Sequence, residues 1–241
     1  MRPFYFEYAH LYDLISGKES VDRMLGLWNL LGGYDLSCKI LDAGCGTGNY
    51  TQFLNDLGFD CLGFDLSEKL LDVAKNKFPE ILFKHGNLLD LNFVEDFDIV
   101  LCRGVLNDVD NLDFILILKN FYRALKQNGV LLLDVREWNN SLVKYTQTPV
   151  FSKEFTYHNL ACKFTSLTTV NNLDISLDIK EEHLIGRKST KFNFKMYPKS
   201  LEELKITVGK IGFSIENILS AYDYQTQFTN QDKMLLVLKK Y

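Results

Sequence analysis

The stretch that decides the fold is Ile40-Leu41-Asp42-Ala43-Gly44-Cys45-Gly46-Thr47-Gly48-Asn49. It passes from an apolar run into a turn with glycine at every second position, and an amphipathic segment follows from Tyr50. Strand, glycine-rich turn and helix in this order are typical of a ligand site at the carboxyl edge of a parallel sheet, where backbone amides approach the ligand closely. The sequence therefore predicts a strand, a binding turn and a helix over residues 39–54.

Apolar runs and helical patterns alternate after this unit. The runs cover residues 59–64, 81–83, 97–102 and 130–135. One helix should begin after Ser67, and another should run from about Leu112 to Lys126, with Gly129 as its left-handed cap. This alternation predicts right-handed crossovers, and hence an α/β fold with a doubly wound, mostly parallel sheet.

The pattern changes to period two between residues 150 and 197, which predicts a one-sided antiparallel sheet. Ser200 and Glu203 then match a capping box, and the helix they open should end at Gly212. Apolar runs at 213–219 and 234–238 should complete the main sheet. We therefore expect a main unit of residues 1–135 and 199–241, with residues 1–20 as a helical cover, and a β-rich substrate cap of residues 136–198 inserted after the fifth strand.

The composition of the chain excludes several classes of binding partner. The 27 basic and 31 acidic side chains leave a net charge of −4, which argues against a nucleic-acid partner because such binding needs clustered Lys and Arg. No stretch approaches the roughly 20 apolar residues of a membrane span, so we expect no membrane partner and a cytoplasmic location. Five cysteines stand singly, which predicts buried, reduced thiols and no metal site.

The charge of the binding turn selects among its possible ligands. Asp42 precedes the first glycine, and a fixed negative charge there suits a cationic amine better than a pyrophosphate. A dinucleotide site also needs glycine where Asn49 stands, although an NAD-dependent oxidoreductase stays a rival interpretation. Asp65 ends the second strand, where a carboxylate can accept both hydroxyls of a ribose. These features favour S-adenosylmethionine, whose amino-acid end carries an ammonium beside a sulfonium.

Asp42, the glycine turn and Asp65 together resemble the motifs of class I, Rossmann-like S-adenosylmethionine-dependent methyltransferases, and the likeness runs from about Tyr8 to Tyr241. The resemblance implies S-adenosylmethionine as cofactor, S-adenosylhomocysteine as product, and in-line displacement at the methyl carbon, which positioning and exclusion of water accelerate. It also implies a set of cofactor-binding residues: Asp42, Gly44 and Gly46 at the methionyl part, Asp65 at the ribose, Leu66 on one face of the adenine, Asn87 and Leu88 at its edge, and Arg103 beside the methyl group.

The segment after the fourth strand bears on the acceptor. Residues 102–108 contain no proline, whereas enzymes that methylate amino groups of bases carry a proline pair here, so we expect a small-molecule acceptor. The runs at 133–139 and 190–198 are similar to glycine/sarcosine N-methyltransferases, in which an arginine past strand five binds the acceptor's carboxylate; Arg136 matches it. Val105 stands where that family has an asparagine, which favours an acceptor larger or more apolar than glycine. Aminosugar N-methyltransferases are similar as well.

The amino-terminal tyrosines complete the expected acceptor site. Tyr5, Tyr8 and Tyr12 are spaced to share one face of a helix. The resemblance implies an aromatic cover over the site, so Tyr8 is a candidate substrate-binding residue, and Tyr8 and Tyr12 are the candidate catalytic residues. Their alternative interpretation is a helix that simply packs on the domain.

Amine nitrogen is the favoured acceptor atom. An O-methyltransferase of a hydroxylated or carboxylated metabolite needs a general base, and the four histidines stand alone in the sequence (His10, His85, His158 and His183). A sensor or scaffold that binds the cofactor without turnover is the alternative of another class, and a homo-oligomer is implied by resemblance alone.

Overall fold

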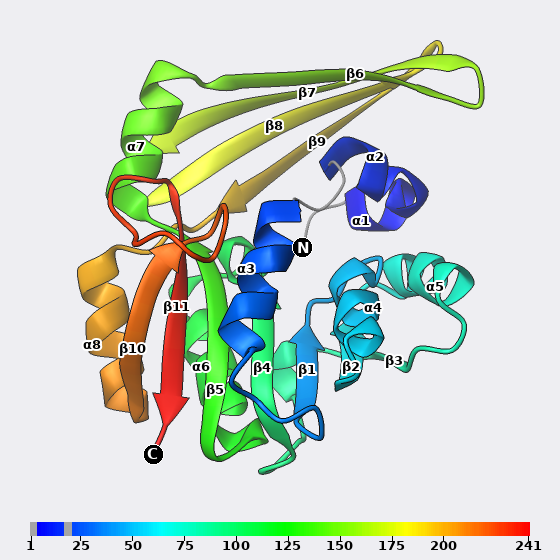
Figure 1. Cartoon of the computed structure of the whole chain (residues 1–241). Coiled ribbons are helices and arrows are strands. Elements are labelled where there is room, and N and C mark those ends of the chain that lie inside the picture. Colours follow the sequence, from blue (N-terminus) through cyan, green and yellow to red (C-terminus); the bar gives the residue numbers. More distant parts are fainter. Residues whose placement is uncertain (1–3, 17–20) are drawn as a thin grey trace.

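The computed structural model describes residues 4–16 and 21–241. Two sheets lie one above the other, with the amino-terminal helices between them (Figure 1). The lower, main sheet has seven strands in the order β10-β11-β5-β4-β1-β2-β3. Their bounds are β1 Lys39–Ala43, β2 Asp60–Asp65, β3 Phe83–His85, β4 Phe97–Arg103, β5 Leu125–Arg136, β10 Phe213–Ser220 and β11 Lys233–Lys240.

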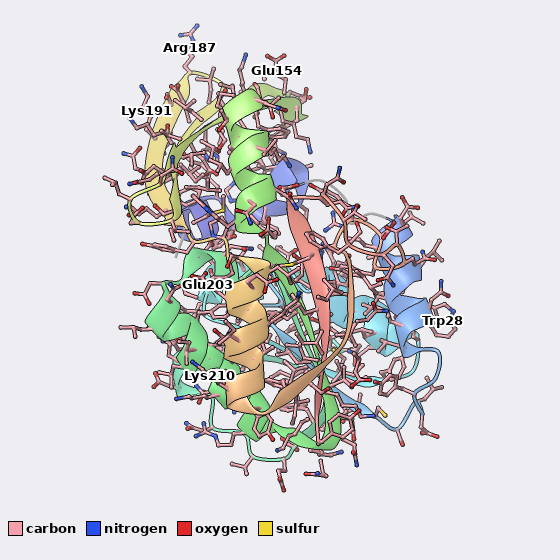
Figure 2. All side chains as sticks on the ribbon, turned by 90° about the vertical axis from the view of Figure 1, so that its left-hand side faces the viewer. Trp28, Glu154, Arg187, Lys191, Glu203 and Lys210 are labelled. Atoms are coloured by element: carbon pink, nitrogen blue, oxygen red, sulfur yellow. The ribbon has the colours of Figure 1, made fainter. Side chains whose placement is uncertain are left out.

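Strands β1 to β5 are parallel to one another, and β11 runs antiparallel to both β5 and β10. Helices α3 (Val21–Leu31) and α4 (Asn49–Asp56) pack on one face, and α6 (Asn111–Ala124) and α8 (Leu201–Ile211) pack on the other. Figure 2 shows Trp28 of α3 and Lys210 of α8 on opposite sides of the sheet. The predicted doubly wound, mostly parallel α/β fold is confirmed, and this order brings the carboxyl ends of β1, β2, β4 and β5 to one edge.

Local signals explain most helix ends. The Ser67 hydroxyl accepts the Leu70 amide at the start of α5 (Glu68–Lys77), and the Ser200 hydroxyl accepts the Glu203 amide at the start of α8. Gly212 ends α8 with φ of 116°, a left-handed conformation that glycine adopts without strain. Both predicted helix starts and the predicted cap at Gly212 are therefore confirmed.

The predicted cap at Gly129 is wrong. Helix α6 ends at Ala124, the chain enters β5 at once, and the left-handed residue in this segment is Asn128, with φ of 62°. A Cβ added at Gly129 would lie 2.9 Å from the Lys126 carbonyl oxygen. Glycine is needed there because the backbone approaches itself closely, and not because a helix ends.

The second sheet, called the cap sheet below, consists of β6 (Val150–Tyr157), β7 (Leu160–Asn171), β8 (Ser176–Ile185) and β9 (Lys188–Met196), all antiparallel and in sequence order. Alternate residues of β8, Leu177 and Ile179, are buried with Met196 against side chains of α7 (Trp138–Gln147). The predicted one-sided antiparallel sheet is thus confirmed. Its far end carries exposed charged tips, among them Arg187 and Lys191 (Figure 2).

The amino-terminal segment is not a single helix. It consists of α1 (Phe4–Glu7), the 3-10 helix η1 (Ala9–Leu11) and α2 (Tyr12–Ser16). Tyr8 breaks it, with φ of −127° and ψ of 31°, so the prediction that Tyr5, Tyr8 and Tyr12 share one helical face is wrong. Residues 1–3 and 17–20 of the predicted cover lie outside the described residues.

Three of the five cysteines are buried, whereas Cys38 and Cys45 are half-buried, and all five are free thiols. Among the described helices, none combines the length and the apolar character needed to cross a bilayer.

Candidate active site

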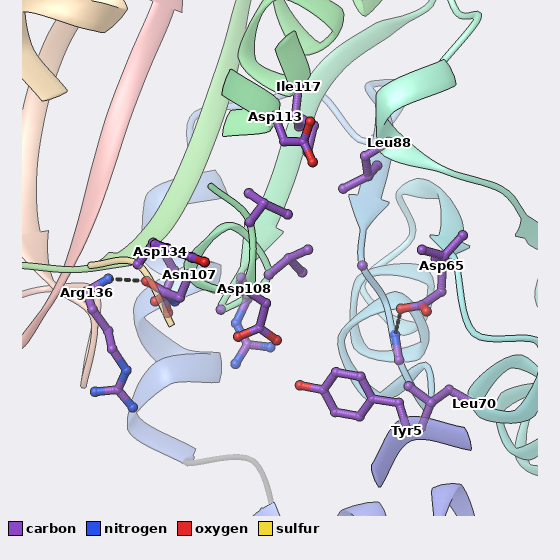
Figure 3. Close-up of a pocket in the computed structure, with 18 of the residues that line it drawn as sticks. Tyr5, Asp65, Leu70, Leu88, Asn107, Asp108, Asp113, Ile117, Asp134 and Arg136 are labelled. Atoms are coloured by element: carbon purple, nitrogen blue, oxygen red, sulfur yellow. Dashed lines mark hydrogen bonds between the residues drawn. The ribbon is translucent and has the colours of Figure 1, made fainter. Parts of the chain in front are cut away.

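A cavity of about 590 Å³ opens at the carboxyl edge of the main sheet. Its walls come from the turn after β1, the ends of β2, β4 and β5, the start of β11, and the amino-terminal helices. In Figure 3, Asp65, Leu70 and Tyr5 stand on one side of the cavity, Asp134, Asn107 and Arg136 stand on the other, and Asp108 lies between them. The cavity therefore extends across several strand ends, and its volume is ordinary for a small-molecule site.

The glycine turn lines the cavity next to Asp65. Gly44 and Gly46 have φ of 84° and 56°, in the left-handed region, and the Gly44 amide donates to the Phe64 carbonyl at 2.7 Å. A Cβ at Gly44 would lie 2.1 Å from Cγ2 of Val105, which leaves no room for a side chain. Both glycines and Val105 line the cavity, as predicted for a turn that lets a ligand approach the backbone.

Asp65 is fixed by two backbone amides. Its Oδ2 accepts the Gly46 amide at 2.9 Å, and its Oδ1 accepts the Ser67 amide at 2.8 Å. Burial raises the pKa of this carboxyl, although the bonded amides act in the opposite direction. Each oxygen keeps a further lone pair, so the carboxylate can accept two more donors from a ligand in the cavity.

Beyond Asp65 the wall of the cavity is apolar. Leu66 and Leu88 line the cavity, and Leu66 is 38% exposed. Asn87 lines the cavity too, and its Oδ1 accepts the Leu89 amide at 3.0 Å, which caps the 3-10 turn η2 (Leu88–Asp90). This arrangement suits a flat aromatic base with an edge that forms hydrogen bonds.

Asp42 does not line the cavity. It is 3% exposed, and its Oδ2 accepts the Thr51 hydroxyl at 2.7 Å. Its charge still acts on its surroundings, since Asp42 contributes to raising the pKa of Cys45, after burial of that thiol. The hydrogen bond with Thr51 joins the end of β1 to α4.

Arg103 lines the cavity at the end of β4. Its Nε donates to the Tyr224 hydroxyl at 2.8 Å, and its guanidinium carbon lies 3.3 Å from the centroid of the Tyr50 ring. The Tyr224 hydroxyl in turn donates to Oδ2 of Asp134 at 3.1 Å. The Tyr50 ring and the Tyr224 hydroxyl therefore hold the guanidinium in one orientation.

Arg136 lies on the opposite side, at the end of β5. Its Nη1 donates to Oδ2 of Asp232 at 2.5 Å, and its backbone amide donates to Oδ1 of Asn107 at 2.7 Å. The Asn107 carbonyl accepts the Tyr197 amide at 2.6 Å. The loop after β4, the end of β5 and the end of the cap sheet are thereby joined around one wall of the cavity.

The amino-terminal tyrosines separate. Tyr12 lines the cavity beside Tyr5, with ring centroids 5.7 Å apart. Tyr8 is 6% exposed and lies outside the lining residues; its hydroxyl is 2.6 Å from Oγ1 of Thr190, and its ring stacks on His183 at 5.6 Å. Asp13 accepts the Thr47 hydroxyl at 2.6 Å and the Lys77 ammonium at 2.8 Å. The segment is therefore bonded to the glycine turn below and to the cap sheet above.

The cavity is also lined by residues that the sequence did not single out, among them Arg23, Asn107, Asp108, Tyr197 and Lys233. Asn107 and Asp108 stand four and five positions after Arg103, and their place after a strand is a usable signal. Arg23 and Lys233 come from α3 and β11, far from every motif, so nothing local marks them.

Comparisons with known proteins identify the family to which this chain belongs. Residues 40–129 match the family model described as a methyltransferase domain. The chain is 31% identical over 150 residues to an uncharacterized methyltransferase of Synechocystis sp., and the match covers 58% of this chain and 70% of that protein. YqeM of Bacillus subtilis, a methyltransferase candidate by its name, is 38% identical over 103 residues, but the match spans only 40% of this chain and 42% of YqeM.

A solved S-adenosylmethionine-dependent methyltransferase from Clostridium acetobutylicum shares the fold over 97% of this chain and 98% of its own, with a TM-score of 0.79 and 19% identity. The chain therefore belongs to the S-adenosylmethionine-dependent methyltransferases. Shorter matches include both an O-methyltransferase and an N,N-dimethyltransferase, so they leave the acceptor atom open.

The described residues fit this cofactor. Nε of Arg23 is buried without a hydrogen-bond partner among them, and since Arg23 lines the cavity, this free donor suits the carboxylate of an amino acid. Asp65 offers acceptors to ribose hydroxyls, and Leu66 and Leu88 offer apolar surface to adenine. The lining thus includes residues suited to the carboxylate, to the ribose and to the adenine of S-adenosylmethionine.

Proposed function

We propose that this protein transfers the methyl group of S-adenosylmethionine to a small-molecule acceptor, with an amine nitrogen as the acceptor atom. The observation that carries the proposal is the single cavity, which joins a half suited to the cofactor, around Asp65, to a second half around Asn107, Asp108 and Arg136. The bound cofactor supplies a methyl group on a positively charged sulfur. The residues of the chain have to hold the cofactor, orient the acceptor and keep water out of the site.

Each predicted cofactor residue that lines the cavity has a proposed task. Asp65 accepts the ribose hydroxyls, the Gly44 and Gly46 turn lies under the methionyl part, and Arg23 binds its carboxylate. Leu66 and Leu88 hold the adenine faces, Asn87 contacts the adenine edge, and Arg103 borders the reacting centre. Asp42 acts through Thr51 and the position of the turn, without touching the ligand.

The lining of the second half favours an amine. Asp108 points into the cavity between its two sides, so its carboxylate can attract a protonated amine from solution (Figure 3). The amine attacks after it has released this proton to solvent and freed its lone pair, so it needs no general base from the chain, and the described lining residues include no histidine to activate a hydroxyl. Val105 lines the cavity beside Gly44 with an apolar side chain, which supports an acceptor other than glycine.

We also propose that residues 136–198 act as a substrate cap and residues 1–20 as a cover of the site. The contacts of Tyr8 with Thr190 and of Asp13 with Thr47 support this division, since they tie the cover to both sheets. Tyr12, which lines the cavity, is the better placed of the two candidate catalytic tyrosines. A cytoplasmic location, a homo-oligomer and the absence of a nucleic-acid partner stay predictions.

The test combines binding with turnover. Calorimetry with S-adenosylhomocysteine should show binding at one site per chain. Labelled S-adenosylmethionine is then offered with matched acceptors that differ in one atom, such as cyclohexylamine and cyclohexanol, or aniline and phenol. Label transferred to amines alone supports the proposal, whereas transfer to hydroxyls alone identifies an O-methyltransferase. Binding without transfer to any amine, carboxylic acid or phenol indicates a sensor, and failure to bind the cofactor contradicts the proposal.

A further inference from the structure

Two cations face one another at the edge of the acceptor half. Lys233 is the first residue of β11, and it pairs directly with Arg136, the last residue of β5, in the antiparallel ladder. Like charges at directly opposed positions destabilise a sheet. Both side chains line the cavity, so the repulsion falls where a ligand can relieve it.

Arg136 already has a carboxylate partner, but Lys233 does not share it. Asp232 accepts Nη1 of Arg136 at 2.5 Å, Nζ of Lys144 at 2.9 Å and the Tyr222 hydroxyl at 2.5 Å. These donors occupy the carboxylate and leave Nε and Nη2 of Arg136 without a hydrogen-bond acceptor among the described residues. One side of this guanidinium is therefore open to a ligand.

The ammonium of Lys233 forms no hydrogen bond or ion pair with any residue that the structure describes, and its Nζ lies 5.8 Å from the centroid of the Tyr222 ring. Burial lowers the pKa of Lys233 to about 8; Arg136 and Arg23 also lower it, and Asp134 and Asp232 raise it. A desolvated ammonium without an acceptor is unfavourable. The place of Lys233 in the cavity thus suits an anion that arrives with a ligand.

Strand order assigns this anion to the acceptor. β11 lies three strands from β1 across β5 and β4, which corresponds to about 14 Å at ordinary strand spacing. The glycine turn follows β1, whereas Asn107 and Tyr197 line the wall next to Arg136. Lys233 therefore lies on the Arg136 side of the cavity, away from the glycine turn, and Arg23 is the proposed cofactor residue whose charge also acts on it.

We propose that Lys233 and the open side of Arg136 together bind an anionic group of the methyl acceptor, a carboxylate or a phosphate. This inference rests on the proposed function and names the substrate class of the same site. Asp232 holds the Arg136 fork in place, and Lys233 supplies a positive charge that forms no ion pair with a carboxylate of the described residues. The acceptor is thus a small molecule with an amine at one end and an anion at the other.

The experiment uses three probes of one shape, benzoate, phenyl phosphate and neutral benzamide. Each is titrated by calorimetry into the protein of 241 residues, with and without saturating S-adenosylhomocysteine. We expect one of the anions to bind more tightly than benzamide, and the preferred anion tells a carboxylate acceptor from a phosphate acceptor. Lys233→Met should weaken that anion about tenfold to hundredfold, the usual range for a lost hydrogen bond to a charged group. Lys233→Arg should keep most of the affinity.

The control is Lys239→Met, which removes a lysine from the same strand at its other end, away from the cavity. It should leave every affinity unchanged, and thermal unfolding checks that each variant folds. Raising the pH through about 8 should weaken anion binding to the native protein, because Lys233 loses its charge there, but not to Lys233→Arg. The groups around this ammonium are Arg136, Asp134, Asp232 and Arg23.

Equal affinity for benzamide and both anions would overturn the proposal, and so would a Lys233→Met protein that binds the anions normally. A Lys233→Met protein that loses S-adenosylhomocysteine instead would assign the lysine to the cofactor. The titrations without S-adenosylhomocysteine keep the two proposals apart, because they detect the anion site even in a protein that does not bind the cofactor.

Discussion

Replacing Asp65 by alanine tests the cofactor half of the site most sharply. In the structure each carboxylate oxygen accepts one backbone amide, from Gly46 or from Ser67, and keeps a lone pair for a ligand. The alanine variant removes both ligand acceptors and also frees two amides of the binding turns. Two effects are therefore expected, one on ligand binding and one on the fold.

The magnitude follows from these contacts. Hydrogen bonds to a charged group contribute about 1.5–3 kcal/mol, and water that fills the space left by the side chain recovers part of this. We expect a net loss of about 1–3 kcal/mol in binding S-adenosylhomocysteine, or roughly 5- to 150-fold in Kd. The freed amides should lower the free energy of unfolding by a further ~1–3 kcal/mol in the ligand-free protein.

The assay separates the two effects with a second ligand. Calorimetry measures the binding of S-adenosylhomocysteine and of its 2′,3′-dideoxy analogue to the native protein and to Asp65→Ala. If Asp65 accepts the ribose hydroxyls, the substitution weakens S-adenosylhomocysteine but has little effect on the analogue, since the two changes remove the same interaction. An equal loss for both ligands would refute the assignment and leave Asp65 as a support of the glycine turn.

Three further substitutions probe other parts of the cavity. Arg23→Met should weaken S-adenosylhomocysteine about tenfold but leave 5′-methylthioadenosine, which lacks the carboxylate, unchanged by calorimetry; equal losses would place Arg23 elsewhere. Arg136→Leu should raise the KM of an anionic acceptor about tenfold and leave cofactor affinity unaltered, and steady-state kinetics that match the native enzyme would contradict its role. Gly44→Ala should lower the free energy of unfolding by ~1–3 kcal/mol and weaken cofactor binding, because the new Cβ would lie 2.1 Å from Cγ2 of Val105 at a φ of 84°. Gly33→Ala is the control and should change neither quantity, because a Cβ at Gly33 would have no heavy atom within 4 Å.

The residues proposed for the cofactor half could be named from the sequence because their signals are local. The glycine turn and Asp65 each stand directly after a strand, and parallel strands bring their carboxyl ends to one edge. The sequence does not show that Thr51 holds the Asp42 carboxylate inside the protein, since the spacing of the two residues is equally compatible with a side chain that faces the ligand.

The acceptor half is harder to predict because distant segments build it. Lys233 meets Arg136 only through the pairing of β11 with β5, and Arg23 reaches the cavity from α3. The tyrosine spacing predicts one helical face, yet the helix breaks at Tyr8, whose ring finds His183 of the cap sheet. Tertiary contacts override local periodicity at that point, and they decide which tyrosine faces the cavity.

A crystal structure of the protein with S-adenosylhomocysteine would locate every proposed cofactor contact in one experiment. We expect the ribose hydroxyls on Asp65, the adenine between Leu66 and Leu88, the carboxylate on Arg23, and the sulfur directed toward the half that contains Arg136 and Lys233. A cofactor bound outside this cavity, or bound with its sulfur directed away from Arg136 and Lys233, would contradict the proposal.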